Sequence, residues 1–152
     1  MTTDTAGLNA PFDLNRFTSA QEGSYVTVLA ELKNGQKRSH WMWYIFPQID
    51  GLGHSPTARF YAIRSCDEAR AYLRHPVLGT RLVECAETLL SLTGRSAAQI
   101  FGFPDDMKLR SCMTLFAAVA EPPSLFDRVL DRYYDGVRDA ATLRILGVPA
   151  HP

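Results

Sequence analysis

The sequence lacks the features that would place it in a non-globular or membrane class. It has 152 residues, of which only 21% are charged and 46% are hydrophobic. A disordered chain needs low hydrophobicity and a high net charge, so that class is excluded. No apolar run approaches the roughly 18 residues of a membrane span. The first eleven residues lack the basic start and apolar stretch of a secretory signal. We therefore expect a cytoplasmic protein without membrane contact.

An excess of charge of either sign is also missing. The 16 Lys and Arg residues balance 16 Asp and Glu residues. A protein that binds nucleic acid by neutralising phosphates needs an excess of basic side chains, so nucleic acid is not an expected partner. The expected partner is an unknown small molecule. A monomer or a weak homodimer is compatible with the balanced charge.

Cysteine and the common catalytic motifs are scarce as well. The cysteines are Cys66, Cys85 and Cys112, and their spacing fits neither a metal knuckle nor a disulfide framework. The histidines have no partner at ligand spacing, so we expect no metal and no cofactor. The chain contains no P-loop, G-x-G-x-x-G, G-x-S-x-G or H-E-x-x-H motif. The familiar nucleotide-binding and hydrolase signatures are thus absent.

Helical periodicity and capping signals run through most of the chain and predict an all-α fold. Serines and an aspartate precede several apolar stripes with helical spacing. The predicted helices are 19–33, one that starts at Ser55, 65–73, 77–92, 96–101, 104–120, 124–134 and 139–146. Residues 39–47 are apolar on every side whichever period is assumed, so periodicity does not choose between helix and strand there. We expect a compact single-domain bundle of about seven to nine short helices over residues 12–147. Residues 1–11 are predicted to be a flexible N-terminus and 148–152 a loose tail.

The first candidate site lies in residues 37–55, KRSHWMWYIFPQIDGLGHS. If the start of this segment is helical, His40 shares a face with the tyrosine four residues later. A histidine beside a phenol supplies a proton donor, and Gly51 and Gly53 let a ligand approach the backbone closely. Aromatic side chains such as Trp43 would wall the pocket. In the alternative interpretation, the aromatic residues belong to the core and the glycines form a tight turn.

The second candidate site lies in residues 103–114. Asp105 points almost along the apolar stripe of the predicted helix, and a carboxylate on that side needs a partner. Lys108, three residues later, is the expected partner. Ser111 and Thr114 fall on another side of the helix. In the alternative interpretation, Asp105 only complements the helix dipole.

A third candidate is Arg81, on the flank of the longest apolar stripe. Its guanidinium is suited to a bidentate clamp on a phosphate or carboxylate. The alternative is a structural ion pair with Glu84, Glu87 or a distant acid.

Four blocks of the chain form a distinctive pattern. They are KRSHWMWYIFPQ (37–48) with Gly51, Gly53 and Ser55; YLRHPVLGTRL (72–82); Asp105 with KL and SCMTLF (108–109 and 111–116); and Asp139 with Thr142 and Leu143. Together these blocks resemble a bacterial family catalogued as domain of unknown function 1810, a family sometimes mislabelled calpastatin. The resemblance covers about residues 12–147. The resemblance implies a compact helical domain with no established reaction. The polar residues inside the matching blocks are the better functional candidates.

Two functions from different classes follow from these residues, and whether the protein is an enzyme stays open. The first is an enzyme, possibly a hydrolase, that acts on a small polar or nucleotide-derived substrate, with His40 and Asp105 as the catalytic residues. The expected substrate-binding residues are Trp43, Gln48, Gly51, Gly53, Ser55, Arg81, Lys108 and Ser111. The alternative is a non-catalytic module that binds a small molecule or a protein through residues 48–55. In a third, structural interpretation, the same polar groups only tie the helices together.

Overall fold

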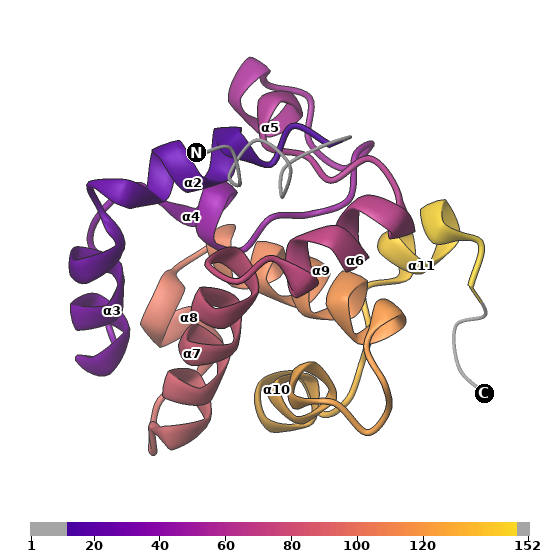
Figure 1. The fold of residues 1–152 in the computed structure, drawn as a ribbon. Coiled ribbons are helices and arrows are strands. Elements are labelled where there is room, and N and C mark those ends of the chain that lie inside the picture. The colour runs from indigo at the N-terminus through magenta and orange to yellow at the C-terminus, as the bar shows by residue number, and fades with distance from the viewer. Residues whose placement is uncertain (1–11, 149–152) are drawn as a thin grey trace.

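The computed structural model describes residues 12–148, and in that range it contains ten helices and no strand (Figure 1). The helices are α2 (Asn15–Glu22), α3 (Tyr25–Lys33), α4 (Met42–Ile45), α5 (Pro56–Phe60), α6 (Cys66–Arg74), α7 (Leu78–Ser91), α8 (Ala97–Phe101), α9 (Asp105–Val119), α10 (Leu125–Tyr134) and α11 (Ala140–Leu146). The predicted all-α class is confirmed, and three of the ten helices are single turns of four or five residues. The predicted flexible N-terminus and, apart from Val148, the predicted tail lie outside the described residues.

Helix α9 lies in the middle of the molecule, against α6, α8, α10 and α11 (Figure 1). Every residue from 111 to 116 is buried, including Ser111 and Thr114. The sequence predicted a single apolar face for this helix. Because neighbours cover it on several sides, the two hydroxyl side chains donate to carbonyls one turn earlier, Ser111 to Met107 (3.2 Å) and Thr114 to Arg110 (2.8 Å). The core is thus built around α9. The first turn of α9 lies at one end of the core and reaches the surface.

Serine and aspartate caps begin the helices at the positions that the sequence predicts. The side chains of Ser55, Ser96 and Asp139 accept hydrogen bonds from backbone N–H groups of the first turns of α5, α8 and α11. The predicted capping box at Ser65 is only half formed. Its hydroxyl caps α6, but the Glu68 carboxylate turns away from the Ser65 backbone to other partners.

The predicted helix 19–33 is in fact two helices, α2 and α3, which meet at Gly23 and Ser24. Glycine weakens a helix interior, and the Ser24 hydroxyl donates to the carbonyl of Ala20 (3.2 Å). The ambiguous apolar segment forms the single turn α4, and then continues into an isolated parallel bridge between Ile49 and Ile63. Within the described range, no helix has the length and apolar character needed to span a bilayer.

The start of α7 is fixed by a glycine and a histidine. A Cβ atom on Gly79 would lie 2.0 Å from the carbonyl oxygen of Leu73, so the close approach of α6 to α7 requires glycine at this position. The imidazole Nδ1 of buried His75 accepts from the backbone N–H groups of Val77 (3.1 Å) and Leu78 (3.2 Å). His75 therefore acts as the side-chain cap of α7, a role that the sequence analysis did not assign.

The cysteines behave as small apolar side chains. All three are free thiols, and Cys85 and Cys112 are buried. Burial raises the pKa of the Cys85 thiol to about 12 and that of Cys112 well above its usual value. Neither buried thiol is therefore poised to ionise near neutral pH.

Candidate functional site

Glu31 fixes the segment that carries the first candidate residues. Its carboxylate is buried at the end of α3 and accepts four hydrogen bonds: from the backbone N–H groups of Arg38 (2.8 Å) and Ser39 (3.1 Å), the Trp41 indole (2.8 Å) and the Ser39 hydroxyl (2.5 Å). Burial alone would raise the pKa of this carboxyl, but the hydrogen bonds from Ser39, Arg38 and Trp41 lower the pKa of Glu31 to about 2. The segment is therefore held by a permanently ionised anchor at neutral pH.

Two lysines converge on the Asp105 carboxylate at the start of α9. The Lys37 ammonium lies 2.9 Å from Oδ2 of Asp105, and the Lys108 ammonium lies 3.5 Å from Oδ1. The side chain of Lys37 is 8% exposed, that of Asp105 19% and that of Lys108 24%. The backbone N–H of Lys37 also donates to the carbonyl of Ile100 in α8 (2.7 Å). We call Lys37, Asp105 and Lys108 the lysine–aspartate cluster; it carries one positive charge in excess.

Both lysines of the cluster also lie over tryptophan rings. The ammonium of Lys37 is 5.1 Å from the ring centre of Trp41, and that of Lys108 is 4.8 Å from the ring centre of Trp43. At these distances the electron-rich face of an indole attracts a cation. The rings therefore help to hold both ammonium groups at the carboxylate.

Trp43 connects the cluster with the glycine-containing loop. Besides the contact with Lys108, its side chain lines a small cavity of about 10 Å³. The other residues around this cavity are Gln48, Ile49, Gly53, Ala58, Tyr61 and Ala62. A cavity of this size holds about one water molecule. The structure thus brings Trp43, Gln48 and Gly53 together, but the loop does not itself enclose a ligand.

Gly51 and Ser55 have local roles in the loop. Gly51 adopts a φ of 107°, and a Cβ atom there would lie 3.2 Å from Cδ1 of Ile145 in α11. The loop therefore needs glycine at this position for both its conformation and its packing. The hydroxyl of Ser55 accepts from the backbone N–H of Ala58 (3.1 Å) as the cap of α5.

His40 lies in the anchored segment, directly before Trp41, and its side chain is exposed. In the described part of the chain no hydrogen bond or ion pair involves its imidazole. Asp105, the other expected catalytic residue, is bound by the two lysines and makes no described contact with His40. No residue between 12 and 148 fixes the exposed imidazole by a hydrogen bond or an ion pair.

Comparison with known proteins identifies the family. The family model described as "Protein of unknown function (DUF1810)" matches residues 11–146. The chain belongs to this family. Among solved structures, it is similar to the conserved hypothetical protein Rv1873 from Mycobacterium tuberculosis, with a TM-score of 0.89 and 50% identity over 91% of this chain and 99% of that one. No curated protein matches it. The DUF1810 match spans every candidate residue, and neither similar description states an activity.

Arg81 does not join the lysine–aspartate cluster of this DUF1810 chain through any described contact. Its guanidinium lies 4.7 Å from the ring centre of Tyr25 and donates to the side-chain oxygen of Gln21 (3.3 Å). The structural alternative of an ion pair with Glu84 or Glu87 is wrong among the described residues: Glu84 instead accepts from the Tyr25 hydroxyl (2.5 Å). Arg81 therefore ties α7 to α2 and α3.

The sequence analysis missed two residues that build the site. Glu31 lies on an amphipathic helix, where an acidic side chain is ordinarily solvated, and no local pattern distinguishes it. Lys37 belongs to the block that resembles DUF1810, but it was not among the candidate residues. Its side chain is only 8% exposed, and its ammonium lies 2.9 Å from the Asp105 carboxylate.

Proposed function

We propose that the protein binds a small anionic molecule at the lysine–aspartate cluster and the adjoining ring of Trp43. The observation that carries the proposal is the imbalance of charge: two ammonium groups share one carboxylate, and all three side chains are less than a quarter exposed. Charges interact more strongly in a partly dehydrated site than in water. A bound anion would supply the missing negative charge.

The chemistry of the cluster favours a phosphate-bearing ligand. Lysine offers a compact point charge with three donors, which suits phosphate without demanding the planar geometry that arginine recognises. Lys108 is the more exposed of the two lysines, so the anionic group would lie against it. Trp43 is only partly buried and offers an aromatic edge beside that charge. These features support a nucleotide-derived or sugar-phosphate ligand, in keeping with the substrate class expected from the sequence.

Calorimetric titration of matched variants tests the proposal. The ligands are inorganic phosphate, AMP, ADP-ribose, NAD and glucose 6-phosphate, titrated into the wild type, Lys108→Gln, Asp105→Asn and Lys33→Gln. Lys33 is exposed at the end of α3 and serves as the control for loss of one positive charge. At a ligand concentration 100 times its Kd, the wild type would gain about 2.7 kcal/mol of stability.

The expected pattern distinguishes anion binding from a purely structural cluster. Lys108→Gln weakens binding of at least one phosphate compound by about tenfold or more, since charged hydrogen bonds contribute about 1.5–3 kcal/mol. Asp105→Asn retains or strengthens binding, because it removes a competing negative charge. Lys33→Gln binds like the wild type. Equal affinity of the wild type and Lys108→Gln for every compound bound would overturn the proposal, and so would the absence of binding.

Hydrolysis is a second candidate, favoured by the exposed and uncommitted imidazole of His40. In this candidate His40 is the general acid or base and Lys108 holds the anionic group of the substrate. The test is product formation, followed by chromatography after incubation with each phosphate compound. If the candidate is right, His40→Gln abolishes turnover while its Kd stays within about threefold of the wild type. If the wild type binds a compound without converting it, the remaining function is the non-catalytic binding module that the sequence analysis gave as the alternative.

A further inference from the structure

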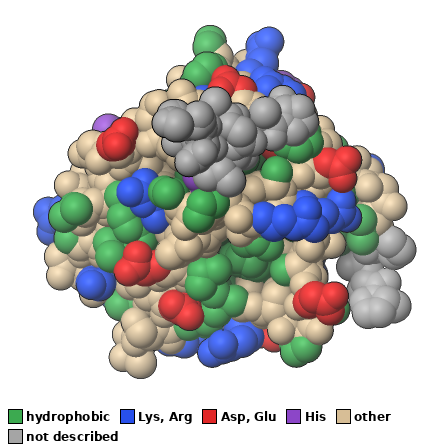
Figure 2. Space-filling view, viewed as in Figure 1, with side chains coloured by type: hydrophobic (Ala, Val, Ile, Leu, Met, Phe, Trp, Pro, Cys, Tyr) green, Lys and Arg blue, Asp and Glu red, His purple; other side chains and the backbone are tan. Residues whose placement is uncertain are grey.

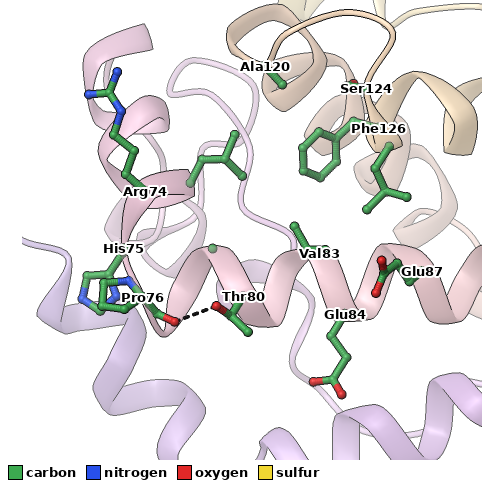
Figure 3. A pocket seen from close by; sticks show the side chains of 13 residues that line it. Arg74, His75, Pro76, Thr80, Val83, Glu84, Glu87, Ala120, Ser124 and Phe126 are labelled. Atoms are coloured by element: carbon green, nitrogen blue, oxygen red, sulfur yellow. Dashed lines mark hydrogen bonds between the residues drawn. The ribbon is translucent and has the colours of Figure 1, made fainter.

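A second surface feature lies at the far end of α9 from the lysine–aspartate cluster. A groove of about 740 Å³ opens between the end of α6, helix α7 and the start of α10 (Figure 3). Its apolar lining consists of Leu73, Pro76, Val83, Ala120, Leu125 and Phe126. From Asp105 to Ala120 the helix rises by about 22 Å, so the groove is separate from the proposed anion site.

The groove carries charges of opposite sign at its two ends. Arg74 lies in the last turn of α6, and Glu87 lies in the third turn of α7. Figure 3 shows these two side chains on opposite sides of Val83. Both are exposed, and no ion pair or hydrogen bond of either side chain is found within residues 12–148. Glu84 also lines the groove and keeps its negative charge, since the Tyr25 hydroxyl that donates to it is neutral.

The floor between these charges is hydrophobic and reaches the surface. Figure 2 shows hydrophobic side chains gathered in the middle of the same face, between α7 and α10. Val83, Leu125 and Ala120 are only partly buried, although each lines the groove. An apolar surface edged by unpaired charges is the pattern expected of an association surface.

We propose that this groove is the contact between two copies of the chain in a weak homodimer. A two-fold axis through the middle of the groove exchanges its two ends. Arg74 of each copy then faces Glu87 of the other, and the apolar floors cover each other. A parallel arrangement would bring like charges together. The opposite charges at the two ends therefore select a second copy, in antiparallel orientation, as the occupant.

The small size of the groove predicts a transient dimer. Stable interfaces bury about 1,200–2,000 Å² in total, and smaller ones support weak association. We expect dimerisation in the micromolar to millimolar range, visible by sedimentation equilibrium at protein concentrations up to about 1 mM.

A charge exchange tests the pairing directly. Arg74→Glu and Glu87→Arg each place two pairs of like charges in the contact, so each weakens dimerisation by about tenfold or more. The double variant carrying both substitutions restores opposite charges and recovers the wild-type Kd to within about threefold. Glu22→Arg, a change on the exposed side of α2, is the control and leaves the Kd unchanged.

Every outcome bears on the proposal. Both residues are exposed, and the melting temperature of each variant shows whether it folds. A wild type that is monomeric at the highest concentration overturns the dimer. Single variants that dimerise like the wild type overturn the contact. A double variant no better than the single ones overturns the pairing of Arg74 with Glu87, and an amphipathic peptide from another protein then becomes the expected occupant.

Discussion

Replacement of Glu31 tests how strongly its buried carboxylate holds the candidate site in place. In Glu31→Gln the side-chain oxygen can still accept from the N–H groups of Arg38, Ser39 and Trp41, but the negative charge is lost. The pKa of Glu31 is about 2, against an ordinary value of 4.5. One unit corresponds to about 1.4 kcal/mol, so ionisation of this carboxyl stabilises the fold by about 3 kcal/mol. Glu31→Gln should cost roughly that amount.

Glu31→Ala should cost more, about 4–5 kcal/mol, because it also leaves three buried donors without an acceptor. In a domain of this length, the loss in Glu31→Gln corresponds to a Tm lower by about 6–12 °C. Glu121→Gln, an exposed change in a loop, is the control and should stay within about 0.5 kcal/mol of the wild type.

The pH dependence gives the same prediction an independent check. Because the folded pKa of Glu31 is lowered, its stabilisation is complete above pH 4.5 and is lost as the pH falls towards 2. Urea unfolding at a series of pH values measures this loss. The wild type should lose about 3 kcal/mol more than Glu31→Gln across that range. A Glu31→Gln variant as stable as the control at pH 7, or with the wild-type pH dependence, would refute the reasoning.

Three further changes probe how the helices are capped and packed. Burial lowers the pKa of His75 below its usual 6.5, so the cap that its neutral imidazole forms on α7 stabilises the fold above that pH and weakens as the pH falls. His75→Ala should therefore lower the free energy of unfolding by about 1 kcal/mol at pH 8. The same variant should show a flatter dependence of Tm on pH between about 5 and 7. Gly79→Ala places a Cβ atom against the backbone of α6 and should lower the free energy of unfolding in urea by about 3 kcal/mol or more. Gly23→Ala, where the Cβ atom meets open space, is the control and should stay within about 1 kcal/mol of the wild type. Equal effects of the two changes would contradict the close approach of α6 and α7. Glu68→Gln leaves the buried guanidinium of Arg16 without its counter-charge and should cost about 3–5 kcal/mol in the same assay, while a loss below about 1 kcal/mol would contradict the importance of this ion pair.

The helices follow from local signals, and the exceptions have local reasons. Serine caps such as Ser96 place helix starts correctly, because a hydroxyl satisfies a free N–H group of the first turn. The predicted helix 19–33 was begun too early: the apolar stripe that indicated it, from Tyr25 to Leu32, lies wholly in α3, after the break at Gly23. At Ser65, by contrast, a predicted local interaction of the capping box is replaced by a distant one. Glu68 leaves the box for Arg16, a partner 52 residues away that no local pattern indicates.

The candidate site depends on both local and distant contacts along the chain. The sequence predicts the local contacts but not the distant ones. The ion pair between Asp105 and Lys108 is local, and its spacing predicts it. The closer pair of Asp105 with Lys37 joins residues 68 positions apart and could not be predicted. Trp43 was selected for its aromatic ring, but only the fold shows that the ring lies between Lys108 and the glycine-containing loop. Glu31 gave no signal, because its partners lie in a segment without regular structure.

The two tryptophans of the chain allow the central claim to be measured at the site itself. Trp41 and Trp43 give two indole N–H signals in a ¹H–¹⁵N correlation spectrum, assigned by replacing each with phenylalanine. Titration with the phosphate compounds should shift the Trp43 signal in a saturable way, with a smaller change for Trp41, whose N–H is bound to Glu31. In Lys108→Gln the shift should require about ten times more ligand. If a phosphate compound binds while the Trp43 signal stays in place, or if none moves it at all, the anion site is not at the lysine–aspartate cluster.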